Sequence, residues 1–105
     1  DKAAVKSSDI LMINADRGYT EIELASGQKK TCVRKSLKAW EEELGQYGFM
    51  RINDGCIINC RYVREIEGGT AVIRNTGAKL KVSRRRKTEC AAFFRDYSVK
   101  SSRYI

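Results

Sequence analysis

The sequence has 105 residues, of which 21 are Lys or Arg and 13 are Asp or Glu, so its formal net charge is +8. That length suits one domain, and an apolar share of 42% excludes a chain too polar to build a core. No apolar run approaches the roughly 20 residues of a membrane span, and the basic balance indicates an anionic partner, nucleic acid first among them.

Catalysis finds little support in the sequence. The chain has no His, the commonest general base, and it has no Gly-rich phosphate loop. The adjacent Gly68 and Gly69 are typical of a hairpin turn. We therefore expect a binding protein that is not an enzyme and needs no cofactor.

The four cysteines, Cys32, Cys56, Cys60 and Cys90, could form two disulfides in a secreted protein. The sequence shows no apolar signal-peptide segment, however, which favours reduced and mostly buried thiols in a cytoplasmic protein. The Cys56–Cys60 spacing differs from that of a zinc knuckle, and no His can complete a ligand set. We predict no metal site.

Three strands are predicted early in the chain. Residues 1–8 are polar and aperiodic, as in a linker. An apolar run at 10–13 predicts a buried strand, and alternation over 19–24 predicts a half-solvated one. A third strand follows at 28–33.

The apolar spacing then becomes helical. Leu37, Trp40, Leu44 and Tyr47 share one face, Ser36 suits the N-cap, and a glycine at 45 or 48 can end the helix. We expect Trp40 and Tyr47 in the core and the acidic residues 41–43 on a solvated face.

Two hairpins and a second helix complete the predicted elements. Strands are expected at 49–52, 56–59, 62–67, 70–74 and 79–82. The first pair turns at Asn53-Asp54-Gly55, a sequence that favours the positive backbone angles of tight hairpins. A helix is expected over 83–97, so the domain would span residues 9–97, with 98–105 as a polar tail. The fold class is mainly β, with one central amphipathic helix and a C-terminal helix.

Basic residues gather in two runs. Residues 79–87 hold six Lys or Arg and no acid, and residues 29–38 hold five. Arginine forks can bind phosphate oxygens or the O6/N7 edge of guanine. If Ser83 caps the second helix, free amides there could also face a phosphate. A solvated basic surface without a partner remains the alternative on charge alone.

Several motifs occur in an order that is typical of one family. Residues 10–20 (ILMINADRGYT) are similar to an opening ILYIEA-x-x-x-Y-T, and residues 37–44 to an L-x-x-L-E-x-x-L helix. Residues 49–52 and 57–59 resemble F-x-R-hydrophobic and the V-N that ends the next strand. Tyr62 and Val63 follow in place, and residues 82–85 resemble a closing V-S-R-R. In this order the sequence, from about residue 10 to 86, resembles the LytTR (LytR/AlgR) family of bacterial DNA-binding domains.

The resemblance implies an elongated domain of short, mostly antiparallel strands packed in sheets. Family members regulate transcription, usually as the output domain of two-component response regulators. They insert loops into successive major grooves of double-stranded DNA at paired repeat sites. The resemblance thus implies a receiver or other signalling domain ahead of this one, a homodimer on DNA, and no membrane partner. The DNA-binding residues that it implies are Arg17, Tyr19, Thr20, Arg51, Asn53, Asp54, Arg84, Arg85 and Lys87.

One segment departs from the family pattern. The family has H-R-S-aromatic where this chain has Asn53-Asp54-Gly55-Cys56. An aspartate there would repel phosphates, or it could accept from the N4 amino group of cytosine. A protein-interaction or dimerisation module with weak, non-specific DNA binding is therefore the alternative function.

Three further interpretations concern two single residues and another class of nucleic-acid partner. Asn59 is interpreted as structural, and Tyr19 stays open between DNA contact and packing. Single-strand or RNA binding has the charge but lacks interleaved exposed aromatics.

Overall fold

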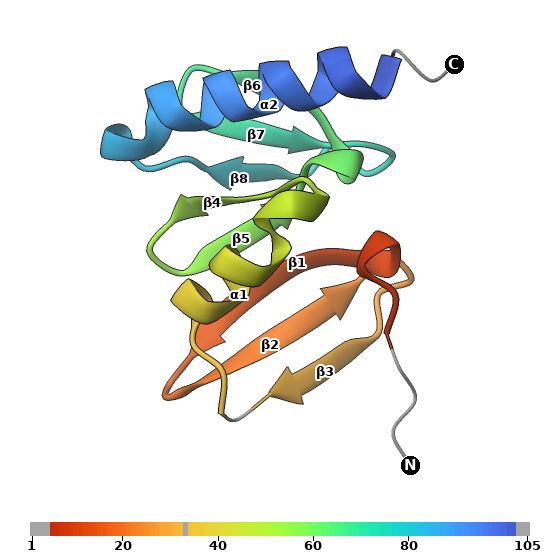
Figure 1. Cartoon of the computed structure of the whole chain (residues 1–105), viewed down its shortest axis with the longest axis vertical. Helices are drawn as coiled ribbons and strands as arrows, with labels where there is room; N and C mark the ends of the chain where they lie inside the picture. The colour runs from red at the N-terminus through yellow and green to blue at the C-terminus, as the bar shows by residue number, and fades with distance from the viewer. Residues whose placement is uncertain (1–4, 33, 103–105) are drawn as a thin grey trace.

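The first five strands form one antiparallel sheet. The computed structural model describes residues 5–32 and 34–102 (Figure 1). The sheet has the order β3-β2-β1-β5-β4. Its strands are β1 (Ile10–Asp16), β2 (Tyr19–Leu24), β3 (Lys29–Cys32), β4 (Phe49–Asn53) and β5 (Cys56–Asn59).

A three-stranded antiparallel sheet and two helices complete the described fold. The sheet has the order β6-β7-β8, and α1 lies on the larger sheet while α2 lies across the smaller one (Figure 1). The elements are α1 (Leu37–Leu44), β6 (Val63–Glu67), β7 (Thr70–Ile73), β8 (Lys79–Lys81) and α2 (Lys87–Ser102). Short 3-10 turns lie at Ser7–Asp9, Gly45–Tyr47, Cys60–Tyr62 and Arg84–Arg86. The predicted mainly β fold with a central and a C-terminal helix is confirmed.

The ends of the domain differ from the prediction. Residues 5–8 are packed rather than linker-like: Val5 contacts the core, and the Ser7 carbonyl accepts from Asn59 Nδ2 at 3.4 Å. Residues 1–4, Val33 of the predicted third strand and 103–105 lie outside the described residues. The second helix begins at Lys87 and continues to Ser102, so residues 98–102 are helical and not a tail. That stretch contains no Gly or Pro to stop a helix.

The first helix begins as predicted but ends differently. The backbone amide of Ala39 donates to Ser36 Oγ at 3.1 Å, which confirms the N-cap. Leu37 and Leu44 are buried, whereas the prediction of Tyr47 as core is wrong, since 56% of it is exposed. After Leu44 the chain tightens into a 3-10 turn, whose three residues per turn rotate Tyr47 off the apolar face.

Side chains of β4 and β5 alternate between two cores. Phe49 and Ile57 point toward α1, together with Ile13. Ile52 and Ile58 point the other way, into a cluster that the smaller sheet and Cys90 of α2 complete. This period-two alternation places one strand pair between both cores, so it fixes the β4–β5 hairpin relative to the rest of the molecule.

Candidate nucleic-acid interface

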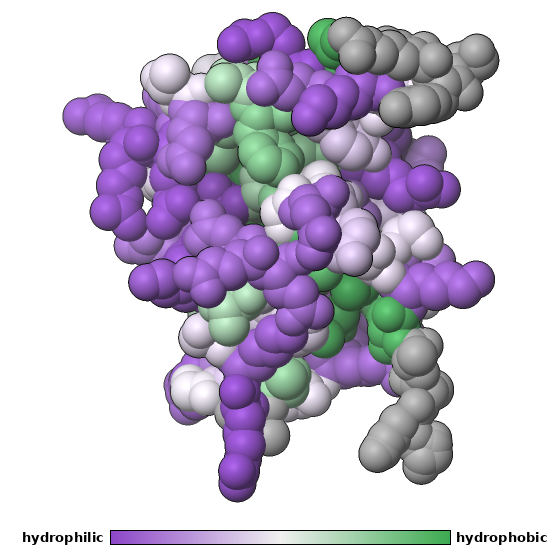
Figure 2. Space-filling model, viewed as in Figure 1, coloured by the Kyte–Doolittle hydropathy of each residue, from purple (hydrophilic) through white to green (hydrophobic). Residues whose placement is uncertain are grey.

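Three connections lie on the same side of the molecule. They are the β1–β2 turn, the tip of the β4–β5 hairpin, and the segment from β8 to α2, all on the left in Figure 1. Hydrophilic side chains project on that side of the surface (Figure 2). Two hydrogen bonds tie the hairpin to its neighbours: Ala15 N donates to Gly55 O at 2.9 Å, and Asn53 Nδ2 donates to Lys81 O at 2.8 Å. The three connections therefore form one surface, called here the loop surface.

The β1–β2 turn presents Arg17 to solvent. Arg17 and Gly18 both have positive φ, 44° and 89°, as the twist-compatible two-residue hairpin turn requires. Arg17 is exposed and Tyr19 is half-buried beside it. The Asp16 carboxylate raises the pKa of Tyr19, first by its charge and then by a hydrogen bond, so the phenol remains a neutral donor.

Thr20 lies behind this turn rather than on the surface. Only 2% of it is exposed, and its Oγ1 accepts from Trp40 Nε1 at 3.0 Å. The same hydroxyl lies 3.2 Å from the carbonyl oxygen of Lys35 and 3.3 Å from that of Cys32. Its hydrogen-bonding capacity is thus used inside the protein, where it joins β2 to the segment that leads into α1.

The hairpin tip is held by side chains of its own residues. Arg51 donates from Nη2 to the Asp54 carbonyl at 2.8 Å and from Nε to the Asn53 carbonyl at 3.3 Å. Asn53 Oδ1 accepts from Gly55 N at 2.8 Å. This side-chain turn replaces the positive backbone angles that the sequence suggested, since no residue of Asn53-Asp54-Gly55 lies in the left-handed region. Arg51 and Asn53, both expected at DNA, therefore shape the tip.

Glu41 connects the hairpin to the last basic segment. Its carboxylate lies 3.7 Å from Arg51 Nη1 and 3.9 Å from Arg86 Nη1. The Arg51 and Arg86 side chains are only 18% and 16% exposed, and that of Glu41 is 35% exposed. Glu41 thus differs from the fully solvated residue expected, and it draws two guanidinium groups inward.

The segment before α2 displays the remaining predicted cations. Arg84, Arg85 and Lys87 are exposed. Ser83 precedes a 3-10 turn and makes no side-chain cap; its amide donates to Ile52 O at 2.8 Å, and its buried Oγ has no hydrogen-bond partner among the described residues. Ser83 therefore does not cap the second helix, which begins at Lys87; it joins the segment to β4 instead.

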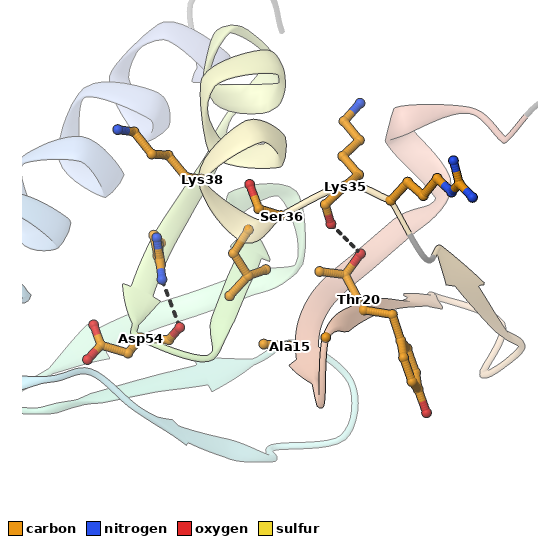
Figure 3. Close-up of a pocket in the computed structure, with 11 residues that line it drawn as sticks. Ala15, Thr20, Lys35, Ser36, Lys38 and Asp54 are labelled. Carbon is orange, nitrogen blue, oxygen red and sulfur yellow. Dashed lines mark hydrogen bonds between the residues drawn. The ribbon is translucent and has the colours of Figure 1, made fainter.

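A depression of about 480 Å³ opens between the first two loops (Figure 3). Ala15 and Thr20 lie on one wall, Lys35, Ser36 and Lys38 on the other, and Asp54 at the edge. The Lys35 ammonium ion-pairs with Glu43 and lies 3.9 Å from the centroid of the Trp40 ring. Lys38 is exposed and has no ion-pair partner among the described residues. The basic run 29–38 was the sequence signal for this wall, although it did not single out Lys38.

The four cysteines are free thiols, and three of them lie in the core. Cys56, Cys60 and Cys90 are buried, and Cys32 is half-buried. Burial raises the pKa of Cys56 and Cys60 to about 12 and that of Cys90 to about 11. These three thiols are therefore protonated, weak nucleophiles at neutral pH.

Among the described residues, no helix combines the length and apolarity needed to cross a membrane.

The fold is a small, mainly β domain, and exposed cations lie on its loop surface. The model of the LytTr DNA-binding domain family matches residues 2–95. The chain belongs to this family, and it is a DNA-binding domain of the kind found in transcription regulators.

The fold also matches a solved structure. It aligns with the LytTr DNA-binding domain of a Bacillus cereus protein described as a methyl-accepting/DNA response regulator, with a TM-score of 0.71 and 19% identity. The alignment covers 85% of this chain and 84% of that one. A search of curated proteins found no match.

Proposed function

We propose that this domain binds double-stranded DNA sequence-specifically, as the output of a bacterial response regulator, by inserting the loop surface into major grooves. The observation that carries the proposal is that four exposed cations from separate parts of the chain meet at the loop surface. Arg17 lies in the β1–β2 turn, Arg84 and Arg85 lie in the turn before α2, and Lys87 is the first residue of α2.

The dimensions support contact with successive grooves. The molecule extends 37 Å along the axis that is vertical in Figure 1, and the three connections follow one another along that axis. One turn of B-DNA is about 34 Å long. In this proposal the β1–β2 turn approaches one groove, and the hairpin tip and the Arg84 segment approach the next.

The predicted contact residues have three roles in this proposal. Arg84 and Arg85 address base edges, while Arg17 and Lys87 neutralise phosphates, with Tyr19 beside Arg17 at the DNA backbone. Thr20, Arg51 and Asn53 position the loops, because their polar atoms are used within the protein. The proposal also includes a homodimer on paired repeats, a signalling domain ahead of this one, and work on DNA in the cytoplasm.

Duplex selection followed by fluorescence anisotropy tests the proposal. A pool of random duplexes is enriched on the wild-type domain, and affinity for the selected site is measured with non-specific competitor. We expect a Kd of about 10⁻⁸ M or tighter and a loss of about 5- to 150-fold for Arg84→Ala. Arg74→Ala is the matched control, because Arg74 is exposed and follows β7 at the opposite side of the molecule. Weak binding that is equal for all duplexes would instead favour the protein-interaction module.

A further inference from the structure

Asp54 and Arg85 form an ion pair at the centre of the loop surface. Arg85 Nη2 lies 2.8 Å from Asp54 Oδ1, although the residues are 31 positions apart in the sequence. The Arg85 and Asp54 side chains remain 70% and 80% exposed. Ion pairs so exposed contribute little to stability, so the pair's main effect is on how the two side chains are held.

The backbones that carry this pair are fixed to each other. Arg51 donates to the Asp54 carbonyl, and the Ser83 amide donates to the Ile52 carbonyl at 2.8 Å. Asn53 Nδ2 bonds to Lys81 O at 2.8 Å. The hairpin tip and the Arg85 segment thus form one unit, and only the carboxylate and the guanidinium extend beyond it.

The exposed ends of this pair offer a defined hydrogen-bonding pattern. Arg85 has a fork of N–H donors, of which Asp54 uses one, and Asp54 keeps a second oxygen as an acceptor. In the major groove a G·C pair presents two acceptors, N7 and O6 of guanine, followed by the N4 amino donor of cytosine. An A·T pair presents the N6 amino donor of adenine where guanine has O6, which would face an arginine donor.

We propose that Asp54 and Arg85 act together to read one G·C base pair. Arg85 donates to guanine O6 and N7, while Asp54 orients the guanidinium and accepts from cytosine N4. The inference rests on the proposed function. It also accounts for an aspartate on a DNA-facing loop, since the adjacent guanidinium offsets its repulsion of phosphate.

The test measures base preference rather than affinity alone. Binding of wild-type domain to the selected site is compared with binding to variant sites in which each G·C pair is replaced in turn by A·T. We expect one position at which replacement weakens wild-type binding by about 5- to 150-fold. In Asp54→Asn and in Arg85→Lys the preference for G·C over A·T at that position nearly disappears. The double variant loses no more of this preference than either single variant. Replacing the guanine by 7-deazaguanine, which lacks the N7 acceptor, weakens the wild type and leaves Arg85→Lys nearly unchanged.

Asp96→Asn is the control, because it removes the same charge from an exposed position on α2, away from the loop surface. Thermal unfolding of each variant confirms that it folds, as expected for side chains this exposed. If Asp54→Asn strengthens binding to every duplex equally and keeps all base preferences, Asp54 acts only as a charge and the paired reading is overturned. A wild-type domain without any preferred duplex would overturn the proposed function and this inference together, whereas specific binding with unaltered preferences overturns this inference alone.

Discussion

Replacing Thr20 with valine tests whether the Thr20 hydroxyl stabilises the fold or contacts DNA. Valine keeps the shape of the side chain but removes the oxygen that accepts from Trp40 Nε1 at 3.0 Å and lies 3.2 Å from the Lys35 carbonyl. A buried polar group left without its partner costs about 1–3 kcal/mol, and Trp40 is only half-buried, so a loss of about 1–2 kcal/mol is expected. With a urea m-value of about 1.5 kcal/mol/M, the unfolding midpoint falls by about 1 M.

The assay is urea unfolding of the wild type, Thr20→Val and Thr31→Val, followed by tryptophan fluorescence from Trp40. Thr31 is exposed on β3, so its substitution controls for the chemical change and should alter the unfolding free energy by less than about 0.5 kcal/mol. If the two variants are equally stable, the hydroxyl is not a joint between β2 and α1. If Thr20→Val stays stable but loses duplex binding, Thr20 contacts DNA directly, as the family resemblance implied.

Two further predictions concern stability. Gly48→Ala should unfold at a lower temperature than Gly27→Ala: both pay about 1–2 kcal/mol for positive φ, 88° and 98°, but only at Gly48 would the new Cβ lie 2.7 Å from the Tyr97 ring. Equal unfolding temperatures would show that this ring moves freely. The buried thiols predict a loss of stability in alkali, because their folded pKa values of about 11–12 exceed the unfolded value of about 8.5. Their contribution is complete below about pH 8.5 and declines as pH rises toward 11–12, since the unfolded chain loses its protons first. The urea midpoint at pH 10 should therefore lie below that at pH 8, and replacing Cys60 with alanine should reduce the difference between them.

Local patterns predicted most of the secondary structure. Alternation over 19–24 and the helical spacing of Leu37 and Leu44 each depend on neighbours within a few residues, and both were confirmed. Ser36 is another local signal, because an N-cap bonds only three residues ahead. The prediction of Tyr47 as a core residue was wrong, because helical spacing in the sequence does not show where an α-helix tightens into a 3-10 turn.

The features of the loop surface that the sequence could not predict depend on contacts between residues far apart in the chain. Thr20 is near a turn in the sequence. Its hydroxyl is buried because the chain folds back and brings Lys35 and Trp40 against it. Likewise the sequence did not show that Asp54 of the β4–β5 hairpin has an ion-pair partner, because Arg85 comes from the connection between β8 and α2. Asn59 was correctly interpreted as structural: 2% of it is exposed, and Nδ2 donates to Ile10 O at 2.9 Å.

Amide chemical-shift mapping tests the central claim most directly. The ¹⁵N-labelled domain is titrated with the selected duplex, and backbone shifts are followed residue by residue. We predict that the largest changes fall at residues 16–19, 53–55 and 83–87, the three parts of the loop surface, while the β7–β8 turn and the C-terminal half of α2 change little. Changes centred on α2 or on the β7–β8 turn would contradict the proposed interface.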